Sequence, residues 1–92
     1  MRLDVIDIDD DVLAKIWRKH AVTFEEAEEA SLSRDRVIRR WREQLVKVFG
    51  QTDAGRYLIV LLARSRERTW WVVTARDMTL PERRSYDKAR AR

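Results

Sequence analysis

The first third of the chain alternates between strand and helix patterns. Residues 2–8 place apolar and polar side chains on alternate faces and predict a short strand. Between positions 9 and 20 the apolar side chains recur every three or four residues, which predicts a helix. Its opening aspartates, Asp9–Asp11, suit the cap and first turn, where carboxylates meet the positive end of the helix dipole. Thr23–Glu26 has the residues of a capping box and predicts a second helix that ends near Leu32.

The remaining two thirds of the chain predict a sheet and a closing helix. Tyr57–Ala63 is the longest apolar run and is typical of a central strand buried on both faces. A second capping box, Thr79–Glu82, has a proline in the first turn and predicts a helix over about 80–90. The order is two N-terminal helices, an antiparallel sheet of three to four strands and a C-terminal helix, which defines an α+β fold in two layers. Runs rich in β-branched and aromatic residues predict the strands at 36–41, 43–49, 57–63 and 69–75.

Length and composition limit the class of protein. The 92 residues predict one domain, 1–92, near the small end of what folds alone. The longest apolar run has seven residues, against roughly 20 for a membrane helix, and no secretory signal is recognisable. The absence of cysteine excludes a disulfide framework and a Cys-ligated zinc site, and the single histidine excludes any mechanism with two imidazoles. We therefore expect a soluble, cytoplasmic domain with no membrane partner, no metal and no cofactor.

Charge divides the chain unevenly. Residues 1–33 carry 4 basic and 9 acidic groups, whereas residues 34–92 carry 16 basic and 7 acidic groups. Of the 20 basic residues 16 are arginines, whose planar fork pairs with phosphate and stacks on bases. This polarity favours a surface that faces a polyanion such as nucleic acid. The alternative is that the arginines only solvate the surface and reflect a GC-rich genome.

Two segments of the sequence resemble motifs of a known family. Residues 18–27, RKHAVTFEEA, resemble the "KHGVSFEEA" element of the BrnT toxin family, and residues 72–86, VVTARDMTLPERRSY, resemble its closing "ISARKAT..ERR.Y" element. The similarity extends from about Ile8 to Tyr86. It implies a RelE-like fold and a metal-independent ribonuclease that acts as the toxin of a type II toxin–antitoxin system. It also implies a BrnA-like ribbon-helix-helix antitoxin and operator DNA bound through the complex.

The sequence departs from this family pattern at several positions. Ile8 replaces a common aromatic residue, Val12 replaces a lysine, and arginines replace an acidic stretch after the second helix. Ala21 stands where the family has glycine, which predicts a backbone there that does not need a positive φ. A non-catalytic module that binds nucleic acid or only the antitoxin is therefore the alternative function.

Four residues are candidates for catalysis. RNA cleavage without a metal needs activation of the 2′-OH, stabilisation of charge on the phosphorane and a proton for the 5′-oxygen. Arg76, at the end of a predicted strand in the matching "AR" element, is the strongest candidate. Arg66 would be a second phosphate clamp, Glu43 a general base or a partner for an arginine, and Tyr86 a proton donor or a stacking ring. The alternatives are a solvated arginine, a cross-strand ion pair and packing under the last helix.

RNA-binding residues are expected around this group. Arg64 is the neighbouring possibility to Arg66 if the register slips by two residues. His20 is more typical of a helix C-terminus than of a catalyst. The predicted RNA-binding set is Lys19, Arg64, Arg83 and Arg84.

Overall fold

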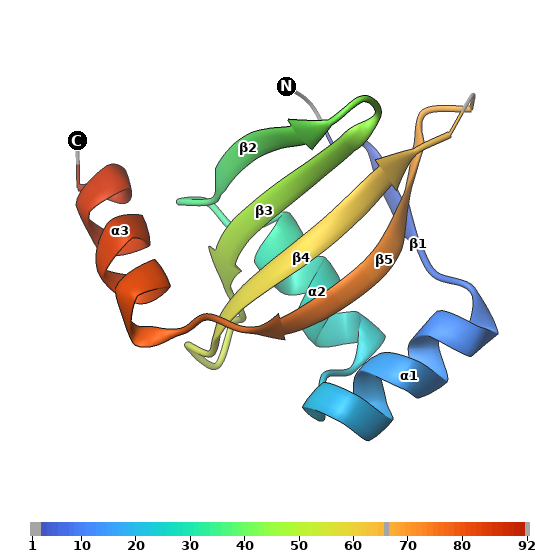
Figure 1. The fold of residues 1–92 in the computed structure, drawn as a ribbon, viewed down its shortest axis with the longest axis horizontal. Helices are drawn as coiled ribbons and strands as arrows, with labels where there is room; N and C mark the ends of the chain where they lie inside the picture. Colours follow the sequence, from blue (N-terminus) through green and yellow to red (C-terminus); the bar gives the residue numbers. More distant parts are fainter. Residues whose placement is uncertain (1–2, 66, 92) are drawn as a thin grey trace.

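Five strands form one mixed sheet in the computed structural model, which describes residues 3–65 and 67–91. The strand order is β1-β5-β4-β3-β2, with β1 parallel to β5 and all other neighbouring pairs antiparallel (Figure 1). The strands are β1 (Val5–Asp7), β2 (Val37–Arg42), β3 (Leu45–Gln51), β4 (Tyr57–Arg64) and β5 (Thr69–Asp77). The helices are α1 (Asp10–His20), α2 (Phe24–Ser31) and α3 (Leu80–Arg90). The predicted α+β class is confirmed.

The expected antiparallel sheet of three to four strands is wrong in the number of strands and in the direction of one of them. The additional strand is β1, where Ile6 lies opposite Trp70 of β5 in a parallel pair. Leu3 and Ile6 each keep only 6% of their surface exposed, so the apolar side chains of this segment hold it against the core. A strand of three residues gives no local sign of its partner, which is why the sequence pattern did not place it in the sheet.

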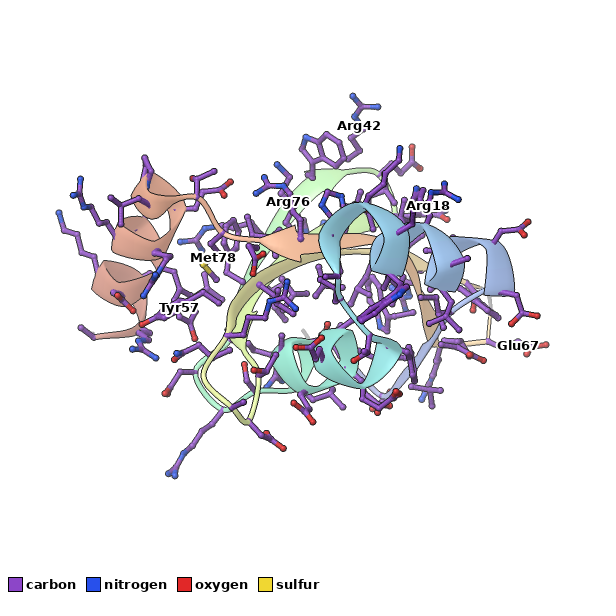
Figure 2. The ribbon with its side chains drawn as sticks, turned by 90° about the horizontal axis from the view of Figure 1, so that it is seen from below. Arg18, Arg42, Tyr57, Glu67, Arg76 and Met78 are labelled. Carbon is purple, nitrogen blue, oxygen red and sulfur yellow. The ribbon has the colours of Figure 1, made fainter. Side chains whose placement is uncertain are left out.

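Helix α2 covers one face of the sheet, and α1 lies along the edge of β5, so that the two helices enclose the main core. Figure 2 shows α2 below the sheet, and Figure 1 shows it behind β3 and β4. The alternation of side chains along β3 and β4 points Val48 and Val60 at these helices, where they meet Ile16 and Ala30. All four side chains are fully buried. Burial of one apolar face of the sheet therefore fixes the register of the central strands.

The C-terminal helix α3 packs at one end of the opposite face. A second, smaller core there contains Ile59 of β4, Met78 and Tyr86. In Figure 1 the helix lies beside that end of the sheet, where it also contacts β2. Both predicted capping boxes are present, at Thr23 with Glu26 before α2 and at Thr79 with Glu82 before α3.

The junction between α1 and α2 contains a left-handed residue. Ala21 has φ 53° and ψ 41° and closes α1, with its N–H donating to the carbonyl of Trp17 at 2.9 Å. The expectation that Ala21 avoids a positive φ is therefore wrong. Val22 is fully buried directly after it, and the side chain of Arg56 donates to the carbonyls of His20 and Ala21. These contacts determine the path of the chain and offset the roughly 1–2 kcal/mol cost of a left-handed alanine.

A close approach of α2 to β3 predicts which glycine the fold cannot replace. A Cβ on Gly50 would overlap the carbonyl oxygen of Ala30 and lie 2.6 Å from Ser33 Oγ. Gly50→Ala should therefore lower the free energy of unfolding by about 3 kcal/mol. Gly55→Ala is the matched control, because a Cβ there meets no atom within 4 Å and only its φ of 95° costs about 1 kcal/mol. Urea denaturation of the two variants checks this, and equal losses would contradict the packing argument.

Candidate functional site

The face of the sheet opposite α2 carries basic and aromatic side chains. Strand register places Lys47 opposite Leu61, Leu61 opposite Thr74, and Ile59 opposite Arg76 on this face. Helix α3 packs at the Ile59 end of this face, and Figure 2 shows Arg42 and Arg76 pointing to the side of the sheet opposite α2. We call the part of this face beyond α3 the uncovered face. Its members are Arg39, Trp41, Arg42, Lys47, Leu61, Trp71, Thr74 and Arg76.

Trp41 is the most exposed ring on the uncovered face. It keeps 46% of its surface exposed and lies in β2, at the edge of the sheet. The guanidinium carbon of Arg42 lies 4.6 Å from the centroid of its indole ring, and Lys47 Nζ lies 4.7 Å from it. Cations at these distances are attracted to the ring face. The result is an ordered cluster of one ring and two cations, the combination on which single-stranded nucleic acids stack.

Arg76 lies at the end of β5 and is joined to the start of α3. Its Nη1 and Nη2 donate to the two carboxylate oxygens of Glu82 at 2.8 and 3.0 Å, and Nη1 also donates to the carbonyl of Asp77 at 3.0 Å. These hydrogen bonds use three of the five N–H donors of the guanidinium and leave two for an external anion. Hydrogen bonding from Arg76 lowers the pKa of Glu82 to about 2, and Glu82 in turn raises the pKa of Arg76. Glu82 is therefore an ionised anchor at neutral pH.

Arg56, which sequence reasoning missed, connects three elements of the fold. Its guanidinium forms a bidentate pair with Asp77 at 2.7 and 3.0 Å and donates to both oxygens of Glu26 at 3.2 Å. Two further hydrogen bonds reach the carbonyls of His20 and Ala21. Hydrogen bonding to Asp77 raises the pKa of Arg56 and lowers that of Asp77. No sequence motif around Arg56 predicts this role, because its partners come from distant parts of the chain.

Tyr86, a predicted catalytic residue, lies on the buried side of α3. Only 3% of its surface is exposed, and its ring meets Tyr57 edge to face with centroids 5.9 Å apart. Burial raises the pKa of its hydroxyl. The guanidinium carbon of Arg90 lies 5.1 Å from the Tyr86 ring centroid, and that of Arg83 lies 4.1 Å from the Tyr57 centroid. At this end of the sheet the rings therefore form a packed base for the cations of α3.

The other predicted site residues do not gather around Arg76. Glu43 lies in the turn between β2 and β3, outside the strand expected at 43–49, and Arg64 ends β4 beside that turn. Arg76 is paired with Ile59, five residues before Arg64 along β4, a separation of about 16 Å. The predicted set is thus divided between the two ends of the sheet. Lys19 on α1 and Arg84 on α3 are exposed, and Arg66 lies outside the described residues.

The described residues offer no place for a metal ion and no membrane span. Within residues 3–65 and 67–91, no three His, Asp or Glu side chains are grouped so that they could hold a metal. No helix in the same part of the chain is long and apolar enough to cross a membrane.

A solved toxin structure has the same fold. It is the crystal structure of the ribonuclease toxin BrnT from Brucella abortus, determined at 1.1 Å resolution. The TM-score is 0.69, and the alignment covers 83% of this chain and 99% of that one at 14% sequence identity. No protein-family model and no curated protein sequence matches the chain. The resemblance to BrnT that the two sequence motifs predicted is thus confirmed at the level of the fold.

The Arg76–Glu82 pair predicts how stability depends on pH. The pKa of Glu82 is lowered from 4.5 to about 2 in the folded chain, so ionised Glu82 stabilises the fold above its unfolded pKa and loses this effect as pH falls towards 2. Glu82→Gln should lower the free energy of unfolding near neutral pH, and the difference from the parent should shrink between about pH 4.5 and pH 2. Glutamine at this position still completes the capping box, so the substitution removes the ion pair without removing the helix cap. Urea titrations across this range measure it, and a difference independent of pH would contradict the assignment.

Proposed function

We propose that the protein is the toxin of a type II toxin–antitoxin system and cleaves RNA without a metal ion. The observation that carries the proposal is Arg76, an anchored guanidinium on the uncovered face with two N–H donors left for an anion. The fold shared with a ribonuclease toxin supports it. A further support is the cluster of Trp41, Arg42 and Lys47, because unpaired bases stack on such rings and their phosphates meet the cations.

In the proposed reaction the 2′-oxygen of a ribose attacks the adjacent phosphorus and the bond to the 5′-oxygen breaks. The 2′-OH loses a proton, the 5′-oxygen gains one, and the products are a 2′,3′-cyclic phosphate and a 5′-OH. Arg76 stabilises the negative charge that develops on the phosphorane oxygens. Glu82, whose pKa is near 2, holds the guanidinium in place and takes no proton. This pre-organised contact is worth most in the transition state, where the charge is greatest.

The proposal extends to partners and location. A BrnA-like ribbon-helix-helix antitoxin would neutralise the protein, the complex would bind operator DNA, and both would act in the cytoplasm. The shared toxin fold and the two BrnT-like motifs support this assignment.

One observation favours the alternative of a non-catalytic module that binds nucleic acid or antitoxin. The fork of Arg76 is occupied by Glu82, and no described residue in hydrogen-bond contact with Arg76 has a pKa suited to proton transfer near neutral pH. In that case the uncovered face would bind RNA without cleaving it.

Expression and chelation test the proposed function directly. Induced expression should arrest growth and degrade cellular RNA, and the purified protein should cleave RNA equally well with and without EDTA, because the described residues contain no metal site. Northern analysis and a gel assay of the purified protein measure this. Normal growth with intact RNA, despite soluble protein, would contradict the toxin assignment, and loss of cleavage on chelation would contradict the metal-free chemistry.

Substitution of Arg76 tests its role in the reaction. Arg76→Ala should lower the single-turnover rate of RNA cleavage about 10²–10³-fold, and lysine should restore only part of it because the fork is lost. Glu82→Gln is the matched control, since it breaks the same ion pair but keeps the guanidinium. It should retain activity within about tenfold of the parent. Equal losses of cleavage rate in the two variants would show that Arg76 acts only through its ion pair with Glu82. This result would contradict a contact between Arg76 and the phosphate.

A further inference from the structure

A second basic site lies at the end of the sheet remote from Arg76. A cavity of about 450 Å³ opens beside the β2–β3 hairpin and is lined by residues of β2, β3, β4 and β5 together with the turn. We call it the hairpin pocket; its chemistry comes from Arg40, Trp41, Arg42, Glu43, Arg64 and Trp70. The volume falls within the usual range for sites that hold a small molecule or a single nucleotide.

The cations of the hairpin pocket have no carboxylate partner among the described residues. Arg40, Arg42 and Arg64 form no ion pair with any residue of 3–65 or 67–91, whereas Arg56, Arg76 and Arg90 each pair with a carboxylate. Glu43 is the single carboxylate of the lining. Three like charges around one cavity repel one another, so the binding of an anion is favoured there.

Aromatic rings give the pocket a second recognition element. Trp70 is only 5% exposed and forms part of the wall, with the guanidinium carbon of Arg64 at 6.0 Å from its ring centroid. Trp41, half exposed, carries the stacked guanidinium of Arg42. Planar guanidinium groups on rings offer a stacking surface for a base beside fork donors for its phosphate.

The hairpin itself is held in a fixed geometry. Gln44 has φ 64°, a left-handed conformation for a non-glycine residue, in the turn that follows Glu43. Its carbonyl accepts a hydrogen bond from the backbone N–H of Arg64 at 2.9 Å. The turn and the end of β4 are therefore joined, and Arg64 keeps its position relative to Arg40 and Arg42. Such pre-organisation lowers the entropic cost of ligand binding.

We propose that the hairpin pocket binds one nucleotide of a single-stranded RNA whose chain passes around the hairpin end of the sheet, over Trp41, and then follows the uncovered face to Arg76. The inference rests on the proposed function insofar as both involve RNA. Arg40 pairs with the core residue Val46, and Arg64 pairs with the core residue Trp70, so both arginines leave the sheet on the face of the main core. Trp41 and Arg42 belong to the pocket and to the uncovered face, and they connect the two sites around the hairpin end of the sheet. The roughly 16 Å between Arg64 and Arg76 makes the pocket a binding subsite away from the scissile phosphate. It sets a minimum substrate length and positions the strand on Arg76.

Binding of 2′-O-methyl oligonucleotides, which cannot be cleaved through the 2′-oxygen, tests the pocket separately from catalysis. An octanucleotide should bind the parent protein more tightly than a dinucleotide does. Arg64→Gln should weaken octanucleotide binding about tenfold and lower the salt slope by about 0.7, the value for one lost phosphate contact on a single strand. Arg40→Gln should act in the same direction. Arg34→Gln is the matched control, because it removes an exposed arginine before β2, at the opposite end of that strand.

The outcomes separate the pocket from the nuclease. Equal weakening by all three glutamine variants would overturn the pocket and leave only general charge attraction. Tighter binding of a polyglutamate peptide than of the octanucleotide, lost in Arg64→Gln, would also overturn it and would point to an acidic protein partner. RNA cleavage that is unchanged in Arg64→Gln would contradict the proposed pocket but would still support the ribonuclease. If the protein cleaves no RNA but binds oligonucleotides in a way that depends on Arg64, the pocket is supported and the proposed ribonuclease is contradicted.

Discussion

The guanidinium of Arg56 is the contact on which the arrangement of layers depends. It satisfies the carbonyls at the left-handed end of α1, pairs with the capping glutamate of α2 and grips Asp77 at the end of β5. Arg76 is the residue before Asp77, and its pair with Glu82 leads directly into α3. The position of the candidate catalytic arginine relative to both helical layers therefore follows from a residue that itself points away from the uncovered face.

The arginines of this chain divide into two groups with different physical roles. Arg56, Arg76 and Arg90 are paired with carboxylates and hold elements together. Those around the hairpin pair with no carboxylate within 3–65 and 67–91, and they remain available to an anion. Composition alone could not separate these roles, because an unpaired arginine and a structural one are identical in sequence. The high arginine content thus serves both architecture and recognition. Only the arginines that pair with carboxylates have their charge neutralised within the fold.

Local signals predicted the elements well, and long-range contacts explain the errors. Both capping boxes are present, and three of the four expected strands begin within one residue of their predicted starts, because caps and apolar periodicity act within a few residues. The prediction for the Ala21 backbone was wrong because its conformation depends on Arg56, 35 residues away. The separation of Glu43 and Arg64 from Arg76 follows from strand register, which no motif spacing reveals. Candidate residues could therefore be named from the sequence, but their arrangement in space could not be predicted from it.

The pairing of β1 with β5 also has a consequence for how the chain folds as it is synthesised. Val5 must meet Thr69, so the edge of the sheet can close only after most of the chain has left the ribosome. Until then Leu3 and Ile6, buried in the finished fold, remain without their partners on β5. Closing so long a loop for a strand of three residues is entropically costly. We accordingly expect the N-terminal strand to join the sheet late and to open readily.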